Sequence, residues 1–268
     1  MVIGHWWQGL RLRREQAAVA RRAIPDDLWK RTLVRYPFLR RRDATDAAEL
    51  RRLTSLFLDR KEFSVAGGLK LSDAMVVAIA AQAVLPVLRL GLARYDGFVG
   101  IVVHAGQVVA RREVADDDGI VHQYDEVLAG EAMEGGPVML SWQDVRAAGR
   151  SAAHGYNVVI HEFAHVLDMA DGLSDGVPLL PADIPVAAWR SLLQHEYGAF
   201  VQRIAREEDT VLDPYGAEGE DEFFAVASEA FFVHPQGMQR EHPGLYGMFV
   251  RFYRQDPAAE TAAPRGAA

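Results

Sequence analysis

The 268-residue sequence predicts a mainly helical α+β protein. Three observations lead to this prediction. Helical periodicity fills the first part of the chain, β-type segments gather between residues 98 and 142, and helical patterns return from Asn157 onward. Half of the residues are hydrophobic and a quarter are charged, which is typical of a globular protein with a substantial core.

The first part of the chain predicts helices over residues 11–23 and 43–60, where apolar residues recur at steps of three and four. Residues 72–73 (Ser-Asp) are a capping signal for the apolar segment 74–88 that follows. That segment is too short to span a bilayer and contains a proline and a glutamine. We therefore expect it to be a buried helix.

The middle of the chain predicts strands over residues 98–114, in two runs joined at Ala105-Gly106. The acidic segment 116–119 (Asp-Asp-Asp-Gly) predicts a turn. A second β run covers residues 135–142.

The last part predicts a helix over residues 157–169 with Asn157 as its cap, followed by a Pro- and Gly-rich loop. Further helices are expected at 186–207 and 218–233. The chain is expected to divide into an N-terminal helical part (1–95) and a catalytic part (96–255) that share one core. Residues 256–268 are rich in Ala and Pro and predict a disordered tail.

Composition excludes several classes of protein. The sequence has no cysteine, so disulfides and Cys-ligated zinc or iron–sulfur sites are excluded, and a reducing compartment fits. The N-terminus lacks the apolar core and cleavage site of a signal peptide. We expect a cytoplasmic protein that does not bind membranes.

Residues 1–60 are basic, with 13 Arg and 1 Lys against 7 acidic residues. Such a segment can bind nucleic acid or an acidic protein. Here the arginines are dispersed among apolar residues at helical spacing, which favours solvated helix faces. The overall pI near 5.6 also argues against DNA binding, so no nucleic-acid partner is expected.

The motif that carries chemistry is His161-Glu162-Phe163-Ala164-His165. The two histidines lie one helical turn apart, so both imidazoles leave one face close enough to share a small ion. Zinc lowers the pKa of a coordinated water, and a neighbouring carboxylate can take the proton as the water attacks a peptide carbonyl. The spacing therefore predicts a metal site with Glu162 as general base.

The alternative is a pair of hydrogen-bonded core histidines. The flanking residues are apolar, so the helix is expected to be buried, and two histidines and a glutamate there need partners. This context favours the metal site.

A catalytic zinc takes three protein ligands, and the third must come from elsewhere. Asp168 lies a turn beyond His165 and is better placed to orient an imidazole. Glu222 and Glu229 are seven residues apart on one face of a Phe- and Ala-rich helix. Position alone favours Glu222 and leaves Glu229 open.

The blocks GPVMLSW, GYNVVIHEFAHVLDMADG and DPYGAEGEDEFFAVASEAFF resemble the Mlc titration factor A family of bacterial zinc peptidases. FLDRKEF and LSDAMVVAIAAQAVLPVL also fit, so the resemblance covers roughly residues 20–255. A shorter similarity, HEFAHVLD and a Tyr seven residues before Glu-Phe-Phe-Ala, links the chain to the catalytic domain of anthrax lethal factor.

The resemblance implies a zincin-like fold with a small β-sheet next to the H-E-x-x-H helix. It implies His161, His165 and Glu222 as ligands of one Zn²⁺ per chain, and Glu162 as the base. It also implies that the phenolic O–H of Tyr215 donates a hydrogen bond to the oxyanion that forms when the peptide carbonyl is attacked, a role that suits a Tyr O–H. The alternative for Tyr215 is a turn residue packed near Pro214.

The predicted function is that of a zinc-dependent, aminopeptidase-like peptidase acting on peptide or protein substrates. The alternative is a module that sequesters a transcriptional repressor, since members of the family bind a glucose-regulated repressor. Residues 137–142 are expected to form either an edge strand beside the zinc helix, where a substrate could pair, or an ordinary core strand.

Overall fold

A computed structural model describes residues 2–115, 121–133 and 135–262. The expected turn at residues 116–119 and the last six residues of the expected tail lie outside these ranges. The helices run as follows: α1 (Val2–Arg21), α2 (Asp26–Arg35), α3 (Ala44–Arg60), α4 (Asp73–Ala83), α5 (Trp142–Ser151), α6 (Val158–Asp168), α7 (Val186–Ala205), α8 (Glu220–Val233), α9 (Pro235–Glu241), α10 (Pro243–Tyr253) and α11 (Pro257–Ala262).

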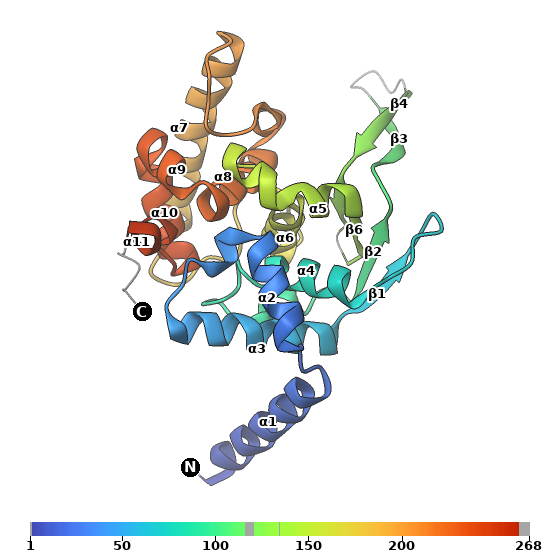
Figure 1. Ribbon diagram of the computed structural model, residues 1–268. Helices are drawn as coiled ribbons and strands as arrows, with labels where there is room; N and C mark the ends of the chain where they lie inside the picture. Colours follow the sequence, from blue (N-terminus) through green and yellow to red (C-terminus); the bar gives the residue numbers. More distant parts are fainter. Residues whose placement is uncertain (1, 116–120, 134, 263–268) are drawn as a thin grey trace.

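The strands lie between the two groups of helices along the chain. They are β1 (Glu62–Val65), β2 (Gly100–His104), β3 (Val108–Ala115), β4 (Val121–Leu128), β5 (Gly130–Ala132) and β6 (Val138–Ser141). In space, α6 lies between the C-terminal helices and the sheet, while α1 extends away from the rest of the molecule (Figure 1). The prediction of a mainly helical α+β fold is confirmed.

The main sheet has the strand order β1-β2-β6-β5. The first three strands are parallel, and β5 is antiparallel to β6. The two β runs joined at Ala105-Gly106 do not pair with each other, because β3 pairs with β4 in a separate two-stranded sheet.

The strand at residues 138–141 is not an edge strand, so the first of the two alternatives for residues 137–142 is wrong and the second, a core strand, is what the structure has. β6 is interior because β2 pairs on one side of it and β5 on the other. Within the described residues, β5 pairs only with β6 and forms the edge beside α6.

One hydrophobic core joins the N-terminal helices, the sheet and α6. Phe163 on α6 is fully buried, and its ring centroid lies 5.0 Å from that of Tyr95, 5.7 Å from Phe57 and 5.8 Å from Phe98. Phe57 lies in α3, and Tyr95 and Phe98 lie between β1 and β2, so the core fixes α6 against the N-terminal half of the chain.

A second aromatic group holds α8 against α7 and α10. The Trp189 ring on α7 lies 6.0 Å from Phe224 of α8 and 5.7 Å from Phe249 of α10, between centroids. Both buried helices that carry candidate site residues, α6 and α8, are thus held from behind by large apolar side chains.

The expected disordered tail is partly wrong. Residues 257–262 form α11, and Ala258 is buried. The Tyr246 hydroxyl donates to Asp256 Oδ1 (2.7 Å) and accepts from the Ala258 amide (2.9 Å). This anchor depends on a tyrosine ten residues upstream, which composition alone does not reveal.

Several arginines of the basic N-terminal segment pair with acids of the same segment. Arg21 contacts Asp59 (3.1 Å), and Arg52 contacts Glu49 (2.7 Å).

None of the described helices within residues 2–262 is long and apolar enough to cross a membrane.

Candidate metal centre

The buried helix α6 places His161 and His165 side by side. Asn157 caps it, since its Oδ1 accepts from the Ile160 amide (3.0 Å), and this fixes where the first turn begins. The two Nε2 atoms lie 3.2 Å apart, on the face directed at α8. Two imidazole nitrogens this close together can bind the same metal ion.

Glu222, in the first turn of α8, completes a cluster of three donor atoms. Its Oε2 lies 3.0 Å from His161 Nε2 and 3.3 Å from His165 Nε2. All three atoms lie within 4.8 Å of one another. Glu222 Oε2 is buried, and neither of these two contacts has the geometry of a hydrogen bond. Two nitrogens and one oxygen that converge on a common point fit a zinc ion better than magnesium or calcium.

Glu229 lies behind His161, two turns along α8 from Glu222. Its Oε1 is 2.8 Å from His161 Nδ1, and its Oε2 accepts from the Asn157 amide. A carboxylate on Nδ1 holds the imidazole with Nε2 directed at the cluster. Glu229 therefore orients His161 and does not join the three donor atoms.

The support of His161 reaches further than the sequence suggested. Asn157 Nδ2 donates to Gln82 Oε1 (2.9 Å), and Gln82 is fully buried on α4. A buried chain of hydrogen bonds thus runs from Gln82 through Asn157 and Glu229 to His161. The only sequence signal for Gln82 is a polar residue within the apolar segment 74–88.

Glu162 lies next to the donor cluster without belonging to it. Its side chain is 4% exposed, and burial raises its pKa to about 7, although the His161 and His165 imidazoles oppose the rise. Gly130 of β5 packs directly on it, since a Cβ at Gly130 would collide with the Glu162 carboxylate. A carboxylate with a pKa near neutrality is suited to proton transfer.

Asp168 does not orient an imidazole, contrary to expectation. Its Oδ2 accepts from the Gly176 amide (2.9 Å), and its Oδ1 is buried without a hydrogen-bond partner in the described chain. Asp168 therefore anchors the loop after α6. Burial raises its pKa to about 7, against the effect of the Gly176 hydrogen bond.

Tyr215 lies at the mouth of the site, in the short helical turn Pro214–Ala217. Its hydroxyl is 3.5 Å from Glu222 Oε1, and its ring centroid is 5.9 Å from that of His161. The Tyr215 amide donates to Asp213 Oδ1 (3.0 Å), which fixes the turn. The structure thus brings all five predicted site residues together.

The charges in the cluster depend on one another. Burial opposes protonation of His161, but the carboxylates of Glu222 and Glu229 raise its pKa well above the usual value. Burial would raise the pKa of Glu222, but His161 and His165 lower it below the usual range. The carboxylate of Glu222 is thus held ionised, as a ligand must be.

Two cavities meet at the site. One of about 190 Å³ is lined by β5 residues, both histidines, Glu162 and Glu222. The other, of about 400 Å³, lies toward the N-terminal end of α6 and shares His161, Glu162, Gly130 and Tyr215 with the first. The donor cluster is therefore open to a ligand.

The fold and this cluster define a class of protein: a mainly helical α+β chain with a metallopeptidase-type site. The model of the family described as "Glucose-regulated metallo-peptidase M90" matches residues 10–254, and the chain belongs to this family. The resemblance read from the sequence blocks is thereby confirmed.

Curated relatives carry the name Mlc titration factor A. The Pectobacterium atrosepticum protein is 37% identical over 79% of this chain and 80% of its own length. The Klebsiella pneumoniae protein is 35% identical over 86% and 87%, and that of Salmonella arizonae is 35% identical over 87% and 92%.

Proposed function

We propose that the protein is a zinc-dependent, aminopeptidase-like peptidase. The observation that carries this proposal is the convergence of His161, His165 and Glu222 donor atoms beside a buried carboxylate that does not join them. A purely structural metal site would not need Glu162 in that place. The family to which the chain belongs is described as a metallo-peptidase.

In this proposal, His161, His165 and Glu222 hold one zinc ion. Zinc supplies a Lewis acid that allows water to react at neutral pH. Glu162 accepts the proton of the attacking water and passes it to the leaving amine. Tyr215, whose ring lies beside His161, donates a hydrogen bond from its phenolic O–H to the oxyanion as it develops.

A peptide substrate fits the edge of the main sheet. β5 is the edge strand beside α6, and Gly130, Glu131 and Ala132 line the site cavity. A peptide added to β5 by main-chain pairing would lie over Glu162 and the donor cluster. We therefore expect the substrate to pair with β5 and not with residues 137–142.

The proposal is tested by hydrolysis of peptides with free and with blocked N-termini, with and without a chelator. Chelator-sensitive cleavage supports a metallopeptidase, and a preference for free N-termini supports aminopeptidase action. Replacing Glu162 with Gln should cost about 10²–10⁴-fold in turnover and leave the zinc content nearly unchanged. Loss of zinc together with activity would mean that Glu162 is misassigned.

A second candidate function is the binding of a transcriptional repressor. It rests on the relatives' name, Mlc titration factor A. The compartment we expect for either function is the cytoplasm. If the Glu162→Gln protein lacks hydrolysis but binds a repressor as tightly as the wild type, sequestration does not need catalysis.

A further inference from the structure

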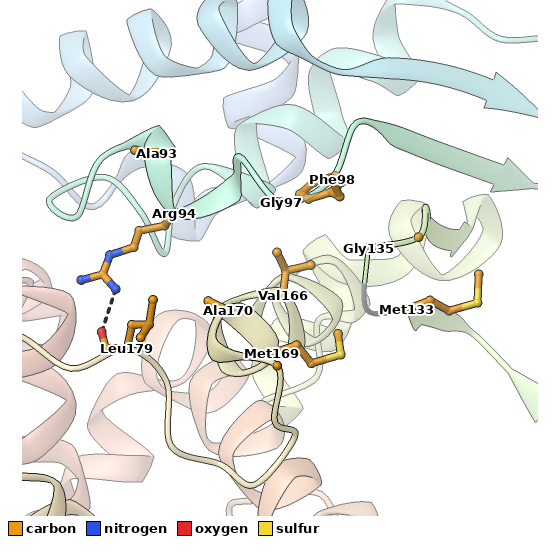
Figure 2. Close-up of a pocket in the computed structure, with 12 residues that line it drawn as sticks. Ala93, Arg94, Gly97, Phe98, Met133, Gly135, Val166, Met169, Ala170 and Leu179 are labelled. Carbon is orange, nitrogen blue, oxygen red and sulfur yellow. Dashed lines mark hydrogen bonds between the residues drawn. The ribbon is translucent and has the colours of Figure 1, made fainter.

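A third cavity lies next to the candidate site, beyond the C-terminal end of α6. It has a volume of about 480 Å³, enough for a large side chain. Figure 2 shows Arg94 and Leu179 at one end, Met133 at the other, and Phe98 and Val166 between them. Neither the proposed metal ligands nor the proposed base lines it.

This cavity continues from the site. Met169, in the turn after α6, lines both the large cavity and the 190 Å³ cavity that holds the donor cluster. Met133 directly follows β5, so a peptide that pairs with β5 passes its side chain. The end between Met133 and Met169 is therefore the entrance from the site, and Arg94 stands at the far end (Figure 2).

Strand direction determines which part of a substrate faces the cavity. Residues Ala129 and Gly130, where β5 begins, line the 400 Å³ cavity, while Met133 and Gly135, after its end, line the large one. Antiparallel pairing is somewhat more stable per residue than parallel pairing. An antiparallel peptide runs from the large cavity toward the 400 Å³ cavity, so its amino-terminal side lies over the large one.

We propose that the large cavity binds the side chain of a substrate residue on the amino side of the scissile bond, and that it selects a large apolar side chain. This inference rests on the proposed peptidase function. Apart from Arg94 and four glycines, the residues that line the cavity have apolar side chains, and Met133 and Leu179 are 41% and 44% exposed. Covering this exposed apolar surface with an apolar ligand gives a favourable binding free energy, because it removes the surface from water.

Arg94 adds discrimination against basic side chains. It is the one charged side chain among the described lining residues, and its Nη1 donates to the Leu179 carbonyl (2.7 Å). That hydrogen bond holds the guanidinium at the end away from the site. A lysine or arginine side chain entering the cavity would meet a like charge there.

The test compares two fluorogenic peptides with free N-termini that differ only in having Leu or Ala before the cleaved bond. We expect the wild type to favour Leu in kcat/KM by about tenfold or more, as additional methylenes in an apolar pocket do. Ala170→Trp fills the cavity and should reduce the Leu/Ala ratio toward one while Ala-peptide cleavage and zinc content persist. The matched control is Ala187→Trp, on an exposed position of α7 outside the cavity, which should keep the wild-type ratio.

A second arm tests the charge. A Lys peptide should be the poorest wild-type substrate, and Arg94→Gln should improve its cleavage relative to the Ala peptide. A wild-type Leu/Ala ratio near one, or a ratio that survives Ala170→Trp, overturns the inference while the peptidase function stands. If the wild type cleaves none of the three peptides, the proposed function fails, and this inference fails with it.

Discussion

The carboxylate of Glu229 decides which nitrogen of His161 faces the cavity. Because it binds Nδ1 and the Asn157 amide together, Nε2 is left for the cluster with His165 and Glu222. Two glutamates on one face of α8 therefore have different tasks. Glu222 is directed at the donor cluster, and Glu229 holds a donor in place.

Substitution of the two glutamates should separate these tasks. Glu222→Ala removes one of three donors and should lose most of the bound zinc. Glu229→Ala should retain zinc at micromolar metal but lose about 10–100-fold in affinity or activity, as is typical for groups that orient ligands. Metal content by elemental analysis and kcat/KM provide the measurements. Equal zinc loss in both variants would contradict the division.

Asp168 predicts a pH-dependent stability. Its folded pKa is raised to about 7 from the ordinary 3.8, so the folded state binds more protons between these values and stability falls as pH rises through that window. Asp168→Asn keeps an acceptor for the Gly176 amide and removes the buried charge. Relative to the wild type, the variant should gain on the order of 2–3 kcal/mol at pH 8 compared with pH 5. Denaturant unfolding at both pH values measures this, and an equal difference at both would refute it.

Local spacing made part of the site predictable. His161, Glu162 and His165 stand on one helix, so their geometry follows from the sequence. The seven-residue spacing of Glu222 and Glu229 predicts a shared face, and position favours Glu222 as the ligand without excluding Glu229. The contact of Asn157 with Gln82 joins residues 75 positions apart, and Asp168 binds a loop amide. Such contacts depend on tertiary packing, which a single sequence does not contain.

At the scale of elements, the approach of β5 to α6 requires glycine at position 130. Gly130→Ala places a Cβ against the Glu162 carboxylate and should displace it. We expect kcat/KM to fall by about 10–100-fold, since small shifts of a reacting group are costly. Gly198→Ala on α7 is the control, because its Cβ would meet nothing within 4 Å. That change should keep activity and stabilise the helix by up to about 1 kcal/mol. Full activity in Gly130→Ala would show that β5 does not position Glu162.

Elements with strong periodicity could be predicted, and short ones could not. The predictions at 43–60 and 186–207 match α3 and α7 closely because each buries an apolar stripe along several turns. β5 has three residues, too few for an alternating pattern, so the sequence offers residues 137–142 as the candidate edge and does not reveal β5. The composition of residues 256–268 predicts a disordered tail, but residues 257–262 form α11. The Tyr246 hydroxyl holds this helix by accepting from the Ala258 amide.

At the scale of the molecule, the candidate centre joins two halves of the chain. α6 is packed on the N-terminal helices through Phe163, and α8 is packed on α7 and α10 through Phe224. The donor cluster lies where these two packed groups meet, since His161 and His165 come from α6 and Glu222 from α8. A metal ion there would link the two groups directly, and a ligand on β5 would contact both.

The most direct test of the account is a crystal structure of the zinc-loaded protein, with anomalous data collected on both sides of the zinc absorption edge. We predict one anomalous peak per chain, about 2.0–2.2 Å from Nε2 of His161, Nε2 of His165 and a carboxylate oxygen of Glu222. Glu162 should lie close to the ion without binding it, and Glu229 should remain on His161 Nδ1. A peak elsewhere, or one with Glu229 or Asp168 in place of Glu222, would contradict the account.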